Sequence, residues 1–341
     1  MEDTMGSALK LCIVGFGNSG QEFCRLLLQR DENVVVTAIA TKSKGNLLNY
    51  NGIDIRNALY EIEKDGIFSK ENCDNVDLST EELIIKSNAD VLIELSTLSI
   101  VDGQPAISYI DTALNNDMHV ITANKGPIAW DFKRLEKLAE EKNKEFLYET
   151  TVMDGTPIFN LLKYGLPGCK VKSFKGILNS TTNFILEEME LGKSYGDAVK
   201  EAQLRGFAEA DPSMDVDGWD AAAKTAALCN VLLNAGLTPI DVKREGIKNI
   251  GIEEIKTAQK ANKKIKLLCE GLIEDNKVIG KVYPMEIPNT HMLSTIDATS
   301  SILCITTDLM GEICIVERNP EIQQTAYGIY SDLLTLIRSI D

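Results

Sequence analysis

Features that would mark several protein classes are missing from this chain of 341 residues. No apolar run approaches the roughly 20 residues that a bilayer-spanning helix needs, and Met1–Lys10 lacks the apolar core of a secretory signal. Basic residues number 35 against 51 acidic ones, and the net charge of −16 argues against nucleic acid or an anionic membrane as partner. We therefore expect a cytoplasmic protein with no nucleic-acid and no membrane partner.

Cysteine and histidine patterns exclude further classes. The eight cysteines include no C-x-x-C pair and no regular spacing, so neither a zinc site nor a disulfide framework is predicted. Free thiols fit a reducing cytosol. The two histidines, His119 and His291, lie in no chemically suggestive cluster, which leaves lysine as the proton carrier to consider if the protein is an enzyme.

The order of apolar segments predicts two domains of different texture. Over 1–150, short buried strands alternate with helices, which is typical of a doubly wound, Rossmann-type parallel sheet. An α+β domain is predicted over 151–320. The last segment, 321–341, contains an amphipathic helix that is expected to pack back on the first domain. The predicted strands are 10–14, 33–40, 90–95, 120–122, 145–148, 171–178, 264–273, 277–285 and 302–316.

A glycine-rich loop follows the first predicted strand and opens a helix. Gly15-x-Gly17-x-x-Gly20 has the spacing and the context of a dinucleotide-binding fingerprint. The first glycine allows the tight turn, the second lets the backbone approach a pyrophosphate, and the third permits close helix–strand packing. A plain tight turn is the alternative. The predicted cofactor contacts in this loop are Gly15, Phe16, Gly17, Asn18, Ser19 and Gly20.

The end of the second strand bears on the choice of cofactor. A carboxylate there would hold a ribose 2′-hydroxyl, but the sequence reads Ala40-Thr41-Lys42-Ser43-Lys44. Two lysines and two hydroxyls suit a 2′-phosphate, which favours NADP and makes Thr41 and Lys42 candidate contacts. Ordinary solvated loop lysines are the alternative, so NAD stays open. Ser96 and Thr97 end another strand of this sheet, where the nicotinamide half should pass.

The segment Gly206–Lys224 is the first candidate for a reaction centre. It carries five carboxylates and runs into a helix that is apolar almost all round from Ala221 to Leu233. Asp220 and Lys224 lie four residues apart and so share one face of that helix. An ion pair with little polar surface around it is costly unless it has a use. The alternative is an exposed i,i+4 salt bridge, worth about 0.3–0.5 kcal/mol.

Five segments together resemble homoserine dehydrogenase. They are VGFGNSG (14–20), VITANKGPIA (120–129), ETTVMDGTPI (149–158), GILNSTTNFIL (176–186) and GFAEADPSMDVDGWDAAAK (206–224), and they follow the family's order over essentially the whole chain. The last is highly specific, whereas the glycine loop alone is not. The resemblance implies reversible reduction of L-aspartate 4-semialdehyde to L-homoserine with NAD(P)H, in threonine and methionine biosynthesis.

The resemblance also implies roles for charged residues. Lys224 would be the catalytic lysine, with Asp220 one turn earlier holding its ammonium. Lys125, just after a predicted strand, would bridge cofactor and substrate and is a second candidate for assisting proton transfer; a simple helix-entry lysine is the alternative. Which of the two lysines moves the proton is left open.

Substrate contacts and a cation loop follow from the same resemblance. Glu209 and Asp220 would bind the ammonium and hydroxyl ends of the substrate, with Asp215 assisting. Thr181 would offer a hydroxyl and a backbone donor, although a helix cap is an equal alternative. The family's loop for a structural monovalent cation such as Na⁺, which binds largely through backbone carbonyl oxygens, matches Glu149, Val152, Asp154 and Thr156.

The chain departs from the family pattern near its end. Glu317–Gln324 replaces a glycine-rich loop, which puts cofactor affinity or closure in doubt, and Ser180 replaces a glycine. The chain stops at Asp341, so no C-terminal regulatory domain is expected. The resemblance implies that 151–320 is the substrate-binding and dimerisation domain, and a homodimer is expected. Two other hypotheses remain: a related amino-acid dehydrogenase, and a non-catalytic NAD(P)-binding sensor, which the altered loop motivates.

Overall fold

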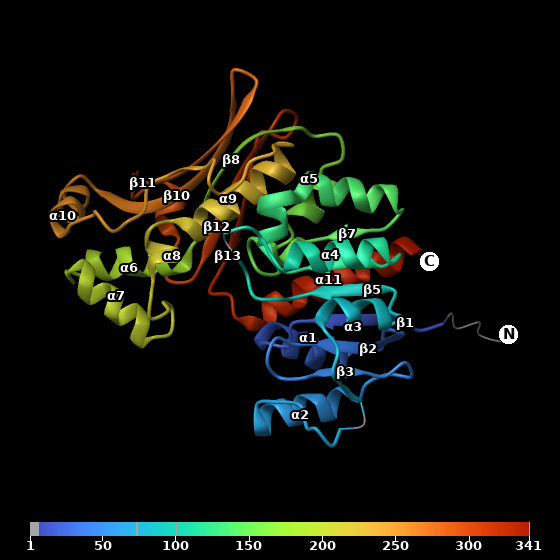
Figure 1. Cartoon of the computed structure of the whole chain (residues 1–341). Coiled ribbons are helices and arrows are strands. Elements are labelled where there is room, and N and C mark those ends of the chain that lie inside the picture. The colour runs from blue at the N-terminus through green and yellow to red at the C-terminus, as the bar shows by residue number, and fades with distance from the viewer. Residues whose placement is uncertain (1–6, 73, 100, 341) are drawn as a thin grey trace. The chain divides into compact units, whose positions relative to one another are not determined.

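The computed structural model describes residues 7–72, 74–99 and 101–340. The chain divides into two compact units, both drawn in Figure 1. Unit 1 comprises Met1–Pro127, Lys133–Pro157 and Glu321–Asp341, and unit 2 comprises Ile128–Phe132 and Ile158–Pro320. Among the described residues, no helix is long and apolar enough to cross a membrane.

Unit 1 is built on a seven-stranded sheet, counted over the described residues, with the order β4-β3-β2-β1-β5-β6-β7. The five strands from β2 to β7 in that order run parallel, which confirms the predicted doubly wound sheet. The two strands at the other edge were not predicted, and they pair antiparallel. The strands are β1 (Leu9–Val14), β2 (Val34–Ala40), β3 (Asn46–Leu48), β4 (Asn75–Val76), β5 (Val91–Glu94), β6 (His119–Thr122) and β7 (Phe146–Leu147).

Helices cover this sheet. Its central strands are therefore buried on both faces, as parallel strands usually are. In Figure 1 the last helix, drawn in red, lies beside α1. Its residues Ile329, Leu333 and Leu336 share one apolar core with Phe23 of α1. The helices are α1 (Asn18–Leu27), α2 (Ile55–Asp65), α3 (Thr80–Lys86), α4 (Ala106–Asn115), α5 (Lys125–Glu141) and α11 (Ile322–Ile340).

Unit 2 is built on a six-stranded sheet within the described chain, with the order β13-β12-β8-β10-β11-β9. Its strands pair antiparallel except β9 with β11, as the α+β prediction requires. The strand predicted over 302–316 is in fact a hairpin of two strands. The strands are β8 (Val171–Ile177), β9 (Lys243–Arg244), β10 (Lys263–Glu274), β11 (Lys277–Pro288), β12 (Ser301–Thr307) and β13 (Glu312–Glu317).

The segment after Gly218 is apolar nearly all round because the helix it forms, α9, is largely buried. It packs on β10 and β11, and Cys229 lies against Gly271 and Gly280 of those strands; a Cβ at Gly271 would lie only 2.9 Å from the Cys229 sulfur. Burial on several sides removes the polar face that a surface helix would have. The helices of unit 2 are α6 (Ser180–Glu190), α7 (Tyr195–Leu204), α8 (Ser213–Val216), α9 (Trp219–Leu232) and α10 (Ile252–Lys260).

The expectation that the cysteines are free thiols is wrong for one pair. Cys304 and Cys314 lie directly opposite each other on β12 and β13 and form a disulfide. The antiparallel register brings together two residues that are ten positions apart, and spacing along the chain does not reveal such pairing. Five other described cysteines are free: Cys12, Cys24, Cys169, Cys229 and Cys269.

Candidate active site

The glycine loop of unit 1 has the geometry of a phosphate cradle. Gly15 has φ +101°, and a Cβ there would lie 2.2 Å from the Leu95 carbonyl oxygen. A Cβ at Gly20 would lie 2.4 Å from the Gly15 carbonyl oxygen, whereas the position over Gly17 is open. Gly17 is also the N-cap of α1, and no side chain in the described part of the chain caps the first N–H groups of this helix. The loop therefore fits an anion at this helix N-terminus.

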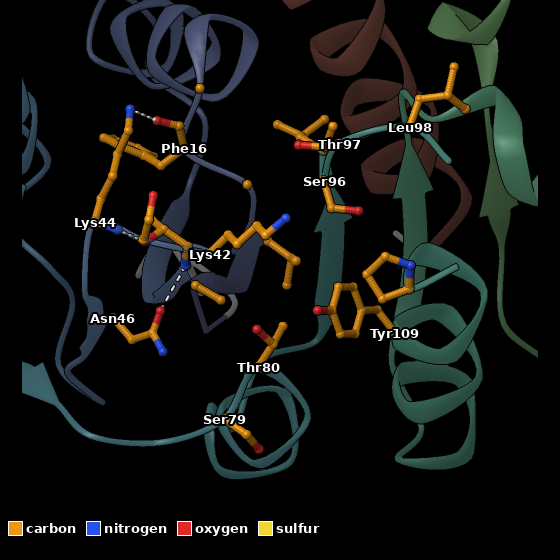
Figure 2. A pocket seen from close by; sticks show the side chains of 18 of the residues that line it. Phe16, Lys42, Lys44, Asn46, Ser79, Thr80, Ser96, Thr97, Leu98 and Tyr109 are labelled. Carbon is orange, nitrogen blue, oxygen red and sulfur yellow. Dashed lines mark hydrogen bonds between the residues drawn. The ribbon is translucent and has the colours of Figure 1, made fainter. Parts of the chain in front are cut away.

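A pocket of about 800 Å³ opens beside this loop, within unit 1 (Figure 2). Seven of the predicted cofactor residues line it: Gly15, Phe16, Gly17, Thr41, Lys42, Ser96 and Thr97. Asn18, Ser19, Gly20 and Lys125 are not among the residues that line it. Sequence reasoning missed a further wall, since no motif marks its residues: Ser79, Thr80, Ser99, Gln104 and Tyr109.

Charge in the pocket is opposite to that of the whole chain. The described lining residues include Lys42 and Lys44 and no aspartate or glutamate, although the net charge of the protein is −16. Lys44 donates to the Phe16 carbonyl oxygen at 3.2 Å, and the Thr41 hydroxyl donates to the Gly45 carbonyl oxygen at 2.7 Å. Lys42 is exposed, and Figure 2 shows its side chain extending into the pocket. Lys42 is thus the cation best placed to meet an anionic group there.

The ends of β5 and β6 bring polar residues together at the carboxyl edge of the sheet. Lys125 begins α5, whose N-cap is Asn124. Glu94, which the sequence reasoning did not single out, is fully buried and accepts hydrogen bonds from the Ser96 N–H and the Thr122 hydroxyl, both at 2.8 Å. Burial raises the pKa of the Glu94 carboxyl, and these hydrogen bonds oppose the rise.

In unit 2, Asn179 joins two carboxylates of the candidate reaction centre. Its side-chain amide donates to Asp215 at 2.7 Å and to Asp220 at 3.0 Å. Its side-chain oxygen accepts from the Thr182 N–H at 2.8 Å and caps α6. Burial raises the pKa of Asp215, and the neighbouring Asp220 carboxylate adds to the rise. The sequence carried an N-cap signal here but not the contacts across to α8 and α9.

Lys224 lies beside the same two acidic residues on a helix that is otherwise buried. Its ammonium donates to the Leu178 carbonyl oxygen at 2.6 Å and lies 3.7 Å from Asp220. The side chains of Lys224 and Asp220 are 18% and 17% exposed, so this is not a solvated surface pair. The cluster therefore offers both signs of charge in a sheltered setting, which a zwitterionic substrate requires.

Two predicted substrate residues have other contacts. The Thr181 hydroxyl donates to the Phe207 carbonyl oxygen at 2.7 Å, and the cap of α6 is Asn179 rather than Thr181. Glu209 is exposed, and its backbone carbonyl accepts from Gln203 at 3.1 Å. Asp211 accepts from the Ser213 N–H at 3.0 Å, and Asp217 pairs with Lys248 at 2.9 Å, in keeping with local roles for both.

The proposed cation loop forms a buried turn in unit 1. Glu149 lies in the short helix η1 (Glu149–Thr151), and Glu149, Val152 and Thr156 are buried. The Asp154 carboxylate accepts from the Thr325 hydroxyl at 2.7 Å. In the described chain, no group of three His, Cys, Asp or Glu side chains could hold a metal ion. These residues therefore fit a cation only through backbone carbonyl oxygens.

The segment that departs from the family pattern, Glu317–Gln324, is split between two elements. Glu317 ends β13, and α11 begins at Ile322, within the predicted segment 321–341. The Gln324 carbonyl oxygen lies 2.4 Å from where a Cβ on Gly155 would stand, so this first turn of α11 needs glycine at 155. The histidines have structural roles: His119 begins β6 and accepts from the Glu145 N–H at 3.0 Å, and His291 caps Met292–Thr295.

Family comparison agrees with both units. The family model described as homoserine dehydrogenase matches residues 157–334, and the model described as homoserine dehydrogenase, NAD binding domain, matches residues 15–149. The chain belongs to the homoserine dehydrogenase family.

Relatives of known name cover nearly the whole chain. It is 33% identical to an NAD(+)-dependent homoserine dehydrogenase of Pseudomonas canavaninivorans, covering 97% of this chain and 96% of that protein. It is 35% identical to a homoserine dehydrogenase of Methanocaldococcus jannaschii, covering 97% and 99%. A solved hyperthermophilic archaeal homoserine dehydrogenase in complex with NADPH is 27% identical with a TM-score of 0.84, covering 97% and 98%.

Family membership decides the reaction class. The chain is an NAD(P)-dependent oxidoreductase that acts as a homoserine dehydrogenase, interconverting L-aspartate 4-semialdehyde and L-homoserine. The fold class expected from the sequence is confirmed by the solved structures.

Proposed function

We propose that Asn179, Asp215, Asp220 and Lys224 form the centre that binds the substrate and supplies its proton. Lys224 carries this proposal. Its ammonium is held between the Leu178 carbonyl oxygen and the Asp220 carboxylate, on a helix that is otherwise buried. A sheltered lysine with two acceptors is oriented before any substrate arrives, and preorganisation of this kind is what electrostatic catalysis requires.

The chemistry needs a proton at one defined atom. When bound, the nicotinamide cofactor supplies a hydride to the aldehyde carbon. The aldehyde oxygen then becomes negative and must receive a proton or lie against a positive charge. The Lys224 ammonium can do both, and in the reverse direction the neutral amine can accept the hydroxyl proton. Asp220 holds this ammonium, while the Asn179 amide keeps Asp220 and Asp215 in place.

Other residues are proposed for binding. Asp220 and Glu209 would hold the polar ends of the substrate, with Asp215 assisting and Thr181 shaping the start of α6. Glu209 is exposed, so it would engage only when substrate binds. Lys125 remains the second candidate for proton transfer because it begins a helix at the carboxyl edge of the unit 1 sheet, the edge at which ligands bind in such folds.

NADP is the cofactor we propose to be preferred. The support is the position of Lys42, which is exposed in a pocket whose described lining contains no carboxylate. A ribose 2′-phosphate would gain from the lysine, whereas a 2′-hydroxyl would lack the acidic partner it usually has. Known relatives include both an NAD(+)-dependent enzyme and one solved with NADPH, so the preference rests on this chain's own residues.

Three further properties are proposed: a bound cation, a homodimer and a cytoplasmic location. A monovalent cation such as Na⁺ would be held by carbonyl oxygens of Glu149, Val152, Asp154 and Thr156, and would stabilise the turn without joining the reaction. A homodimer would form through the sheet of unit 2, where Val316 is exposed. Light scattering at several concentrations would test the dimer, and cell fractionation would test the cytoplasmic location.

The deciding experiment follows NADPH and NADH oxidation with L-aspartate 4-semialdehyde. We expect turnover by the natural chain and a loss of kcat of at least about 100-fold in Lys224→Ala, because a proton donor contributes on this scale. Lys125→Ala is assayed beside it. Cofactor binding without turnover in the natural chain would favour the sensor hypothesis. Full activity of Lys224→Ala would remove that lysine from the mechanism while leaving the reaction in place.

A further inference from the structure

Glu94 is a fully buried carboxylate at the point where two loops leave the unit 1 sheet. It is the last residue of β5 and has an exposed fraction of 0%. Burying a carboxylate is costly unless hydrogen bonds replace its water, so a buried glutamate in this position needs an explanation. An apolar side chain would fill the space without that cost.

The hydrogen bonds of Glu94 form a closed ring. Its Oε1 accepts from the Ser96 N–H and its Oε2 accepts from the Thr122 hydroxyl, each at 2.8 Å. The Thr122 oxygen in turn accepts from the Asn124 N–H at 3.0 Å, and the Asn124 amide donates to the Ser96 carbonyl oxygen at 3.2 Å. The ring thus joins the loop after β5 to the loop after β6.

Two members of this ring, Ser96 and Asn124, lie at or next to candidate functional residues. Ser96 and Thr97 line the nucleotide pocket. On the other side, the Asn124 side-chain oxygen accepts from the Gly126 N–H at 3.0 Å, so the cap of α5 spans Lys125. One carboxylate therefore determines where a pocket wall and the backbone of Lys125 stand.

We propose that Glu94 is a positioning residue that fixes the Ser96–Thr97 pocket wall and the backbone of Lys125 through this hydrogen-bonded ring. It lines no part of the pocket and acts only through its partners. The part concerning Lys125 rests on the proposed function, whereas the part concerning the pocket wall requires only that the pocket binds a nicotinamide dinucleotide.

The test uses the isosteric variant Glu94→Gln. Both partners of Glu94 are donors, but glutamine has one acceptor oxygen in place of two, so the ring must lose a bond or turn the Thr122 hydroxyl away. Leaving a buried hydrogen-bonding group without its partner corresponds to roughly a tenfold change in an equilibrium or rate. We therefore expect NADPH binding, followed by cofactor fluorescence, to weaken about tenfold in this variant, with kcat falling as well.

A matched control separates positioning from simple stability. Glu61 of α2 is also a buried carboxylate of unit 1, accepting from the Asn57 amide at 2.9 Å and the Ser69 N–H at 3.0 Å, and it does not line the pocket. We expect Glu61→Gln to lower the unfolding midpoint while leaving NADPH affinity and kcat unchanged. Equal effects of the two variants on NADPH affinity, at equal loss of stability, would overturn the proposal.

Coupling to Lys125 is measured by combining variants. If Glu94 acts through Lys125, Glu94→Gln should lower kcat much less in a Lys125→Ala background than in the natural chain. Fully additive effects on kcat would overturn this part of the proposal. Should the natural chain show no turnover, the proposed function fails, but the NADPH-binding comparison still decides the role of Glu94 at the pocket wall.

A second variant covers the case in which Glu94→Gln does not fold. Thr122→Val keeps the shape of the side chain and removes the hydroxyl that donates to Glu94 and accepts from Asn124. We expect the same direction of change, weaker NADPH binding with a lower kcat. Unchanged binding in a folded Thr122→Val protein would overturn the proposal.

Discussion

The guanidinium of Arg244 lies 3.8 Å from the centroid of the Trp219 ring, within cation–π range, and also donates to the Asp217 carbonyl oxygen. Arg244 is on β9, and Trp219 begins α9, the helix that carries Asp220 and Lys224. Gly218, directly before Trp219, has φ +79°, and the Arg244 stem packs against it. This contact supports the start of α9, the helix that carries two residues of the proposed reaction centre.

Replacing Arg244 by lysine should therefore affect both stability and substrate binding. Lysine keeps the charge but loses the planar stack and the fixed donor geometry. We expect Arg244→Lys to lower the free energy of unfolding by about 1 kcal/mol, measured by urea denaturation, and to raise KM for the aldehyde. Lys243→Ala, an exposed neighbour on β9, serves as control. An unchanged KM would show that the start of α9 does not depend on this contact.

Gly246 packs against the backbone just before Gly218, which leads to a second prediction. A Cβ there would lie 2.2 Å from the Val216 carbonyl oxygen and 2.6 Å from the Asp217 Cα, both of them backbone atoms. Gly246→Ala should destabilise the protein by about 1–3 kcal/mol, because the backbone has to move. Gly236→Ala is the matched control, since no heavy atom lies within 4 Å of its Cβ position. Thermal unfolding of both variants measures the difference. Equal unfolding midpoints for Gly246→Ala and Gly236→Ala would contradict this packing.

Cofactor preference should depend on Lys42 more than on Lys44. Lys42→Glu places a carboxylate where a 2′-phosphate would lie, and the ratio of kcat/KM for NADPH to that for NADH should fall by about tenfold or more. Lys44 instead donates to the Phe16 carbonyl oxygen of the glycine loop. Lys44→Ala should therefore weaken both cofactors alike. A Lys42→Glu enzyme with the preference of the natural chain would contradict NADP selection by this lysine.

Asp215 should make a pH-dependent contribution to stability. Burial raises its pKa above the ordinary value of about 3.9, so the folded state holds this proton to higher pH than the unfolded chain does. The contribution of Asp215 is thus most favourable at low pH and is lost as the pH rises through the raised pKa. Asp215→Asn removes the titration, and its stability relative to the natural chain should increase from pH 4 to pH 7. Urea midpoints across that range measure the difference in stability between Asp215→Asn and the natural chain. A difference that falls as the pH rises would contradict a raised pKa of Asp215.

The Cys304–Cys314 disulfide should make stability depend on redox conditions. It closes a short hairpin loop, with a sequence separation of 10, and a loop of this size corresponds to roughly 3 kcal/mol in the chain-entropy description. The urea midpoint of the oxidised protein should fall when dithiothreitol is added. Cys304→Ser should resemble the reduced protein and show no response to dithiothreitol. A response that persists in Cys304→Ser would place the effect at another cysteine.

Much of unit 1 could be predicted because its signals are local. Runs such as Val34–Ala40 are buried on both faces, and Gly15 and Gly20 stand where any Cβ would collide with a backbone carbonyl oxygen. Short elements such as β3 and α3 carried too weak a periodicity to be found. The sequence predicts one strand over the hairpin 301–317, because its turn, Asp308–Gly311, contains Leu309 and Met310 and so leaves the apolar pattern almost continuous.

The alternating sheet, the glycine cradle and the Asp220–Lys224 spacing can be inferred from the order of residues, because each depends on neighbours a few residues apart. The groups that meet across the chain depend instead on how the elements pack. The tertiary structure brought Asn179 between Asp215 and Asp220, closed the ring of Glu94 with Thr122, and joined Cys304 to Cys314. These contacts depend on strand register and on helix packing, and neither leaves a periodic signal in the order of residues.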